Sequence, residues 1–420
     1  MKIIQELLEG ATPSIDCLID SLGCLLPWLR DYETTPQDPE WHGEGNVKIH
    51  TEMVLKETYN LLQTEAKHLD NAERVSLIMG ALLHDIAKPT TTKQQEINGR
   101  LRTVAPNHAS IGRSYLALKL MELGLDYEIV DTALGLVGYH HEPKQLVIKD
   151  KPAGAYQRLA RLTHPELLYW LELADIRGRY CPDKQQQLDY IEMYRLFAQE
   201  YCAWKRYGAQ YQSWRAYFES ELASWSPETR DFVFANAIRH REAGTICCPE
   251  EELARSYSYR ESFPQVVLTF GVSGSGKSTW IARHLSDYEI ISLDSLRQSV
   301  LGDRSIQKQN SKIVAMAKEK LKLALRSKSN VVWDATNLRR DFRQQVVQIA
   351  RKYGALVTLV VFHCPESSYA SRNQQRRHSI PSGVLRKQLE ILEFPEIDEA
   401  DRVVVVDAEG QILARHGYGQ

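Results

Sequence analysis

The stretch VVLTFGVSGSGKSTW, residues 266–280, decides the fold of the C-terminal third of the chain. It runs from β-branched residues into glycines and then into a Gly-Lys-Ser-Thr step, which fits the pattern G-x-x-x-x-G-K-[ST] between a predicted strand and a predicted helix. The backbone amides of such a loop and the N-terminus of the next helix hold phosphate groups. The motif predicts a nucleotide site formed by Gly271, Ser273, Gly274, Ser275, Gly276, Lys277, Ser278 and Thr279.

Short β-branched runs alternate with helical segments around this loop. They lie at residues 266–270, 289–293, 330–333, 356–362 and 401–406. Apolar strands that alternate with helices are typical of a parallel sheet covered on both faces. We therefore expect an α/β domain that binds ATP or another NTP, with Lys277 at the β- and γ-phosphates and Ser278 as a ligand of Mg²⁺.

Polar side chains follow the second and third of these strands. Asp294 and Arg297 are three positions apart and are expected on one face of the turn after the second strand. Asp334 and Asn337 follow the third strand and can anchor a metal ion or a substrate. Asp294, across the cleft from the phosphate loop, is placed to accept a proton from an attacking hydroxyl. Helix N-capping is the structural alternative for either aspartate.

A basic segment, YASRNQQRRHSIP at residues 369–381, follows the fourth strand. Arg372 and Arg376 are at i and i+4 of a predicted lid helix, so both can face the γ-phosphate; a solvated basic face is the alternative. Together, the motifs of residues 264–408 resemble the polynucleotide-kinase branch of P-loop kinases. This resemblance implies that Asp294 is the general base for a 5′-OH, that Arg297 binds the phosphate next to the terminal nucleoside, and that both arginines serve the lid.

The N-terminal half has a different pattern. From residue 47 to about 180, apolar residues recur every three or four positions, which predicts consecutive amphipathic helices. Eight of the thirteen histidines lie between His42 and His164. Imidazole and carboxylate ligands suit divalent ions such as Mn²⁺, Co²⁺, Ni²⁺ or Zn²⁺, and open positions leave room for an activated water. The candidate ligands follow one another along the chain in the order His50, His84-Asp85, His108, His140-His141 and Asp175. We expect His42, His68 and His164 at the surface.

This series resembles the HD phosphohydrolase superfamily over about residues 40–180. The texts HDIAKPTTT, HASIG and LADIRGR look most like the HD domains attached to CCA-adding enzymes. The resemblance implies two metal ions, the first held by His50, His84, Asp85 and Asp175 and the second by His108 and His140. Because His140 and His141 cannot easily both point inward from one helix, the H-x-x-P spacing favours His140. Lys88 and Arg179, each four residues after a ligand, can hold phosphate oxygens.

An HD domain followed by a polynucleotide-kinase-like domain resembles the bacterial HD-Pnk end-healing enzymes of RNA repair. The resemblance implies a 5′-OH polynucleotide kinase joined to a phosphatase for 2′,3′-cyclic, 2′- or 3′-phosphate RNA ends, acting with an RNA ligase. DNA remains an alternative substrate. The other function classes are a small-molecule kinase fused to a nucleotide phosphohydrolase, and an ATPase that regulates the HD half. We expect an HD domain at 1–180, an aromatic-rich helical extension and linker at 181–258, and a kinase domain at 259–420.

Composition sets wider limits. The 420 residues are 43% hydrophobic and 25% charged, with a net charge of −2, which predicts two or three folded domains without a bulk basic field. Any RNA must then be held by local basic clusters. The seven cysteines form no Cys-x-x-Cys pair, so reduced, buried thiols are expected. Without a long apolar run or an apolar leader segment, we expect a cytoplasmic protein with no membrane contact.

An aromatic stripe continues the helical spacing beyond residue 184. Core or interdomain packing is the main interpretation of such a stripe, and stacking of exposed rings on nucleobases is the alternative. Its members are Tyr190, Tyr194, Phe197, Tyr201, Trp204, Tyr207, Tyr211, Trp214 and Tyr217.

Overall fold

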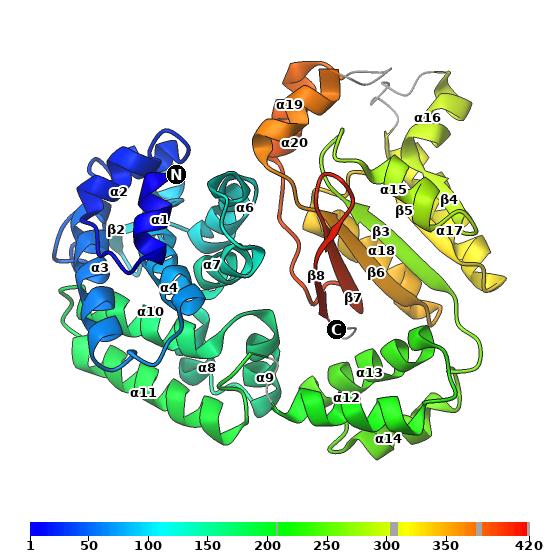
Figure 1. The fold of residues 1–420 in the computed structure, drawn as a ribbon, viewed down its shortest axis with the longest axis horizontal. Helices are drawn as coiled ribbons and strands as arrows, with labels where there is room; N and C mark the ends of the chain where they lie inside the picture. Colours follow the sequence, from blue (N-terminus) through cyan, green and yellow to red (C-terminus); the bar gives the residue numbers. More distant parts are fainter. Residues whose placement is uncertain (207–208, 303–309, 375–379, 418–420) are drawn as a thin grey trace. The chain divides into compact units, whose positions relative to one another are not determined.

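The structure, a computed structural model, describes residues 1–206, 209–302, 310–374 and 380–417. The chain forms two compact units, Met1–Gln210 and Tyr211–Gln420, which Figure 1 shows in blue to green and in green to red. The first is mainly helical and the second contains a mostly parallel sheet, so the predicted fold class is confirmed. The domain bounds expected from the sequence, 1–180, 181–258 and 259–420, stay a prediction.

The first unit is built mainly from helices. Amphipathic segments form them, as the three- and four-residue spacing predicts. In chain order they are α1 (Lys2–Leu8), α2 (Ile15–Leu22), η1 (Pro27–Asp31), α3 (Val47–Gln63), α4 (Asn71–Leu83), α5 (Lys88–Thr91), α6 (His108–Leu120), η2 (Met121–Leu123), α7 (Tyr127–Tyr139), α8 (Glu142–Ile148), α9 (Ala153–Leu162), α10 (Pro165–Arg177) and α11 (Lys184–Glu200).

Helix α4 runs through the core of this unit. Asp70 and Glu73 form a capping box at its start, which satisfies backbone N–H groups that have no partner within the helix. Every residue from Val75 to Leu83 is buried, so the helix packs on all sides. It ends at Leu83 with His84 as its C-cap. The central helix of the core therefore delivers the His-Asp pair directly from its C-terminal end.

A β-hairpin interrupts the helices of the first unit and was not predicted from the sequence. Strands β1 (Lys93–Ile97) and β2 (Arg100–Val104) pair antiparallel around a turn in which Asn98 and Gly99 have φ values of 50° and 73°. Such positive φ values suit asparagine and glycine. The strands are mostly exposed and carry charged and amide side chains, which is why their sequence lacks an apolar strand pattern.

The second unit is organised by a six-stranded sheet in the order β4-β5-β3-β6-β7-β8. The five predicted strands are present and parallel, whereas β8 pairs antiparallel with β7 and was not predicted. The strand order reverses beside β3, and ligands of α/β proteins bind at such a point. The strands are β3 (Gln265–Phe270), β4 (Glu289–Ser292), β5 (Val331–Asp334), β6 (Leu356–Phe362), β7 (Arg402–Val406) and β8 (Ile412–Gly417).

The helices of the second unit follow the strands or precede the sheet. Among them, α18 buries Val346, Val347 and Ala350 along one stripe and packs on β6, as Figure 1 shows in amber. They are α12 (Ala209–Glu221), α13 (Pro227–Glu242), α14 (Pro249–Ser256), α15 (Lys277–His284), α16 (Leu293–Leu301), α17 (Asn310–Arg326), α18 (Arg340–Lys352), α19 (Glu366–Gln374) and α20 (Ser382–Glu390).

Most members of the aromatic stripe lie on α11, in the first unit, or on α12, most of which belongs to the second unit, while Tyr201 and Trp204 follow α11. In the first, the Tyr194 ring stacks on Tyr156 with the ring centroids 5.9 Å apart. In the second, Tyr211 and Trp214 belong to a buried cluster with residues of α13. The packing interpretation therefore fits these members, while Tyr207 lies outside the described residues.

All seven cysteines are free. Cys364 is buried, but Cys17, Cys24, Cys202 and Cys247 are exposed, so the expectation of buried thiols is wrong for these positions. Cys24, Cys202 and Cys247 lie in turns or bends between helices, and Cys17 is not among the buried residues of α2. Among the helices within the described ranges, none combines the length and apolar character that crossing a bilayer requires.

Candidate metal centre and phosphate loop

A cavity of about 370 Å³ in the first unit gathers most of the histidines predicted as ligands. Its wall includes His84, Asp85, His108, His140, His141 and Asp175 together with Lys88 and Arg179. The ends of different helices deliver these side chains: the C-terminal end of α4, the start of α6, the junction of α7 and α8, and the last turn of α10. Helix ends converge here because the helices pack around one core.

The first group of candidate ligands contains His50, His84 and Asp175, whose ligand atoms lie within 4.8 Å of one another. His50 lies in the first turn of α3, and its Nε2 is 3.0 Å from Asp175 Oδ1. All three residues are buried. The structure thus brings together three of the four residues predicted for the first metal site, and Asp85 Oδ2 lies 3.9 Å from His50 Nε2.

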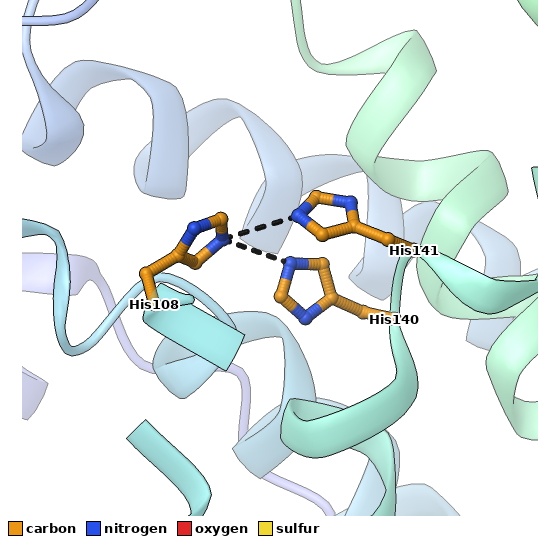
Figure 2. A group of neighbouring side chains, drawn as sticks. All are labelled: His108, His140 and His141. Atoms are coloured by element: carbon orange, nitrogen blue, oxygen red, sulfur yellow. Dashed lines mark hydrogen bonds between the residues drawn. The ribbon is translucent and has the colours of Figure 1, made fainter. Parts of the chain in front are cut away.

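The second group contains His108, His140 and His141 (Figure 2). Nε2 of His108 lies 3.2 Å from Nε2 of His140 and 3.2 Å from Nε2 of His141. The Nδ1 atoms of His108 and His140 lie 2.7 and 2.8 Å from backbone carbonyl oxygens. A carbonyl oxygen only accepts hydrogen bonds, so these Nδ1 atoms carry the proton and the Nε2 atoms face the cavity as the free ligand positions.

This geometry corrects the sequence interpretation of the two adjacent histidines, His140 and His141. His140 is the C-cap of α7 and His141 the N-cap of α8. They do not share a helix, so the argument that only one ring can point inward is wrong. The break between α7 and α8 turns both rings toward His108, as Figure 2 shows.

Asp85 connects the two groups. Its Oδ2 lies 3.2 Å from His84 Nε2, and its Oδ1 lies 3.2 Å from His108 Nε2. The Lys88 ammonium group is 2.7 Å from Oδ2. The buried Asp85 carboxylate therefore faces one imidazole of each group and the Lys88 ammonium group. Such a carboxylate could bridge two cations, one held by each histidine group.

Two predicted cations border the cavity. Lys88 contacts Asp85, and Arg179 forms an ion pair with Asp175. The shared helical face expected for them is absent, because α4 ends at Leu83 and α10 at Arg177. The turns after these helices carry both side chains back to the cavity instead.

The electrostatics favour ligand forms of four of these side chains, His140, His141, Asp85 and Asp175, whereas for His84 burial lowers the pKa but the Asp85 carboxylate outweighs it and raises the pKa. Burial lowers the pKa of His140 and of His141 well below the usual range, so both rings are neutral at neutral pH. Burial opposes the charge of Asp85, but His84 and Lys88 outweigh it and hold the Asp85 pKa well below its usual value. Burial likewise opposes the charge of Asp175, and Arg179 and then His50 lower its pKa. Neutral imidazoles and ionised carboxylates are what a divalent ion binds.

The donor set fits a divalent cation. When His108 and His140 are both neutral, their Nε2 lone pairs face each other across 3.2 Å. In addition, the buried atoms His84 Nε2, Asp85 Oδ2 and Asp175 Oδ1 have ionic neighbours but make no hydrogen bond of regular geometry. A buried polar atom without a regular hydrogen bond is unfavourable, and a cation among these atoms relieves both problems. The cavity therefore suits ions with a preference for nitrogen and oxygen ligands.

Several residues near the cavity were not predicted. His42 was expected at the surface, but it is half-buried, bonds to Glu44 at 2.9 Å and has a pKa lowered by burial to about 3. Glu44 also lies 2.8 Å from His50 Nδ1, and such a contact orients a ligand imidazole. Lys144 lines the cavity and pairs with the buried Glu172 at 2.9 Å.

The other two histidines expected at the surface differ from each other. The side chain of His68 is 53% exposed and contacts Glu166, in agreement with the expectation. His164 is half-buried and caps α10, accepting from the Leu167 amide. No sequence motif pointed to His42 and Glu44 in the loop before α3, because only the fold brings Glu44 to His50.

The phosphate loop of the second unit connects β3 to α15. Gly271, Gly274 and Gly276 have φ values of 154°, 93° and 102°, which explains the glycines at these positions. Lys277 is buried, and its Nζ donates to the carbonyl oxygens of Gly271 and Val272, both at 2.8 Å. The remaining predicted loop residues, Ser273, Ser275, Ser278 and Thr279, lie in the loop or the first turn of α15.

The predicted acceptor-side residues lie in the first turns of α16, directly after β4. The Asp294 side chain is 70% exposed, and its Oδ1 accepts from Arg297 at 2.6 Å. The largely buried Arg297 also donates to Asn310 Oδ1 at 2.8 Å. Ser292, rather than Asp294, caps the helix. The capping alternative for Asp294 is therefore wrong, and its general-base role stays a prediction.

Asp334 is the last residue of β5 and Asn337 follows that strand, close to the phosphate loop. Burial raises the pKa of Asp334, while Lys277 opposes this shift. Asn337 is buried and donates to the Thr269 carbonyl oxygen at 2.6 Å, which ties the segment after β5 to the end of β3. This contact gives Asn337 a structural role whether or not it also contacts a nucleotide.

The predicted lid arginines can be followed only in part. Arg372 lies on α19. A Cβ placed on Gly276 would be 3.6 Å from Nη1 of Arg372, so the Arg372 guanidinium group lies beside the phosphate loop. Arg372 also contacts Glu409 at 3.2 Å. Arg376 lies outside the described residues.

Comparisons with known proteins agree with the two sites. Residues 50–168 match the HD domain family and residues 266–395 match the AAA domain family. Among solved structures, a gluconokinase from Sinorhizobium meliloti 1021 is 31% identical over 36% of this chain and 86% of its own, with a TM-score of 0.28. A chain of the Pnkp1/Rnl/Hen1 RNA repair complex is 24% identical over 31% of this chain and 44% of its own, with a TM-score of 0.29.

The two family matches have direct chemical consequences. A P-loop kinase domain implies a nucleotide and Mg²⁺, and an HD domain implies a divalent metal, which the histidine and aspartate groups of the cavity can hold. The chain is thus an enzyme with a phosphohydrolase domain and a kinase domain. Residues 50–168 belong to the HD domain family and residues 266–395 to the AAA domain family of P-loop proteins, an order consistent with an HD-Pnk architecture.

Proposed function

We propose that the protein heals RNA ends. Its HD domain would remove 2′,3′-cyclic, 2′- or 3′-phosphate groups, and its P-loop domain would phosphorylate the 5′-OH with ATP. The observation that carries the proposal is the presence in one chain of a histidine-aspartate cavity and of a P-loop kinase site in which an exposed Asp294 pairs with the largely buried Arg297. Cleaved RNA can carry both unligatable ends, so the two activities together would prepare a substrate for an RNA ligase.

In the HD cavity, the chain supplies the charges that a terminal phosphate needs. Lys88 and Arg179 lie beside the two buried aspartates and can donate charge-assisted hydrogen bonds to phosphate oxygens. The backbone contacts of His108 and His140 keep their Nε2 atoms directed into the cavity. When bound, divalent ions would supply an activated water and neutralise phosphate charge.

In the kinase domain, the exposed position of Asp294 supports a macromolecular acceptor. A 5′-OH that approaches α16 from solvent can hydrogen-bond to this carboxylate and give up its proton as the oxygen attacks. Arg297, next to it, would exchange its contact with Asp294 for the phosphodiester that follows the terminal nucleoside. Lys277 and Arg372 would hold the phosphates of ATP, which supplies the transferred group.

The proposal is tested by incubating the protein with ATP, Mg²⁺, Mn²⁺ and an RNA that has a 5′-OH and a 2′,3′-cyclic phosphate, followed by analysis of both ends. We expect a 5′-phosphate and a free 2′,3′-diol. RNA that already has these ends serves as the control and should stay unchanged. Failure to alter either end under metal-replete conditions would contradict the proposal.

The same assay separates the other two function classes. A bare nucleoside and gluconate, the acceptor suggested by the name of one structural neighbour, replace RNA as small-molecule acceptors. A polynucleotide kinase should use both poorly. Equal use of nucleoside and oligonucleotide would favour a small-molecule kinase, and ATP hydrolysis without any phosphorylated acceptor would favour a regulatory ATPase.

A further inference from the structure

We propose that Trp41 forms a nucleobase-stacking platform at the mouth of the HD cavity, where it binds the base of the terminal nucleotide whose phosphate is removed. The inference rests on the proposed end-phosphatase function and adds a specificity-determining residue to it. Trp41 lines the same cavity as the histidines and is 43% exposed. A nucleobase can stack on a large aromatic side chain that is exposed beside a phosphate site.

A guanidinium group lies over one face of the indole. The guanidinium carbon of Arg102 lies 4.1 Å from the centroid of the Trp41 ring. The ring stays 43% exposed despite this contact, so we place the base on the face opposite Arg102. A planar base can stack there, and an arginine on the far side leaves that position open while it holds the ring.

Arg102 is itself held firmly in place. It comes from β2, and its Nε and Nη2 donate to the two oxygens of Asp38 at 2.8 and 2.7 Å. Asp38 is buried and also accepts from the Thr103 amide at 3.1 Å. The guanidinium is thus fixed by a bidentate ion pair, which limits its motion beneath the indole.

The backbone that carries Trp41 is also tied down. Trp41 belongs to a rim loop, residues 36–46, whose ends Pro36 and Asn46 form an antiparallel bridge. Within the loop, the Gly43 amide donates to the Tyr180 carbonyl oxygen at 2.8 Å. A stacking partner fixed before binding loses little conformational entropy when a base arrives, so the platform is preorganised.

The charge of Lys88 and its position between the rim loop and the histidine cluster favour a nucleotide over an apolar ligand. Lys88 borders the cavity and bonds to Gln37 of the rim loop at 2.5 Å, while its ammonium group also contacts Asp85. The rim loop therefore connects the aromatic surface to a phosphate-binding cation at the histidine cluster. A ligand with a base at one end and a phosphate at the other matches this sequence of groups.

The test uses the full chain and two short RNAs that differ only at the 3′-terminal nucleotide, which carries a 3′-phosphate and either adenine or no base. Initial rates give KM and kcat for phosphate release, and fluorescence anisotropy of labelled RNA gives binding without metal. We expect Trp41→Ala to raise KM and the dissociation constant for the adenine end about 5- to 150-fold, the range for one stacked base. The abasic end and kcat should change little, and Trp41→Phe should restore most of the preference.

A matched control comes from the second unit. Tyr257 is 68% exposed and also carries a guanidinium, that of Arg260, 3.7 Å from its ring centroid. Tyr257→Ala removes an equivalent exposed aromatic group and should leave HD-domain kinetics unchanged. It controls for the loss of surface aromatic area as such.

The outcomes separate this inference from the function on which it rests. Equal loss of binding for both RNAs in Trp41→Ala, no loss for either, or no preference of the wild type for the adenine end would overturn the platform. If phosphate release by the wild type continues in those cases, the end-phosphatase function stands. If the wild type releases no phosphate from either RNA, that function fails, and anisotropy still decides whether Trp41 binds a base.

Discussion

Asp85→Asn is the substitution that most directly tests the metal centre. The amide keeps the shape of the side chain but removes its charge. The Lys88 ammonium group lies 2.7 Å from Oδ2, so the amide oxygen should take that position and the NH₂ group should replace Oδ1. There it would present hydrogens to His108 Nε2, which lies 3.2 Å from Oδ1 in the wild type.

The magnitude follows from the contacts of the two carboxylate oxygens. Each lies 3.2 Å from an imidazole nitrogen of one histidine group, so each could interact with a cation held by that group. An interaction with a charged group contributes about 1.5–3 kcal/mol, so the loss of two amounts to about 3–6 kcal/mol. At about 1.4 kcal/mol per factor of ten, metal affinity should fall roughly 10²- to 10⁴-fold.

Calorimetric titration with Mn²⁺ measures this affinity, and phosphate release from 3′-phosphate RNA over a range of Mn²⁺ concentrations measures its effect on activity. Kinase activity of the same preparation shows that the chain is folded. Asp183→Asn is the matched control, because Asp183 also lines the cavity but bonds to Gln187 at 2.7 Å. Wild-type metal affinity and normal phosphate release in Asp85→Asn would refute the bridging role.

Four further predictions concern the second unit. Lys277→Ala should abolish 5′ phosphorylation and leave phosphate release intact, since the loop ammonium is lost; loss of both activities in a folded protein would contradict independent sites. Asp294→Asn should lower kcat about 10²- to 10⁴-fold with ATP binding unchanged, whereas Arg297→Ala should raise KM for 5′-OH RNA. Steady-state kinetics decides both, and a near-normal kcat for Asp294→Asn would remove the general base. Glu399→Ala should destabilise the unit by about 3–5 kcal/mol, because Arg343, paired with it at 2.6 Å, stays buried without its partner; denaturant unfolding that matches the wild type would exclude this.

Features that depend on neighbouring residues could be predicted from the sequence. The phosphate loop is one, because its glycines adopt positive φ and its lysine follows at a fixed spacing, all within residues 271–277. The five parallel strands are another, since their β-branched composition reflects burial on both faces. Strand β8 and the β1-β2 hairpin were missed, because edge and exposed strands lack that composition.

The candidate ligands could be named from their order along the chain, but not their arrangement. Helical spacing placed His140 and His141 on one helix, whereas the junction of α7 and α8 turns both toward His108. The same reasoning placed Lys88 on the helix of His84, and only the turn after α4 brings it to Asp85. Periodicity predicts the faces of a helix but not where the helix ends within the fold.

The sequence by itself determined which chemical groups this protein has: a phosphate-binding loop, a histidine-aspartate series and the type of each unit. Only the tertiary structure decided which groups meet, as when Arg102 of β2 pairs with Asp38, 64 positions away, and so fixes the ring of Trp41. The physical reason is that local patterns encode backbone conformation and burial. Contacts between distant segments depend on how whole helices pack, and their side chains become neighbours only after the core has formed.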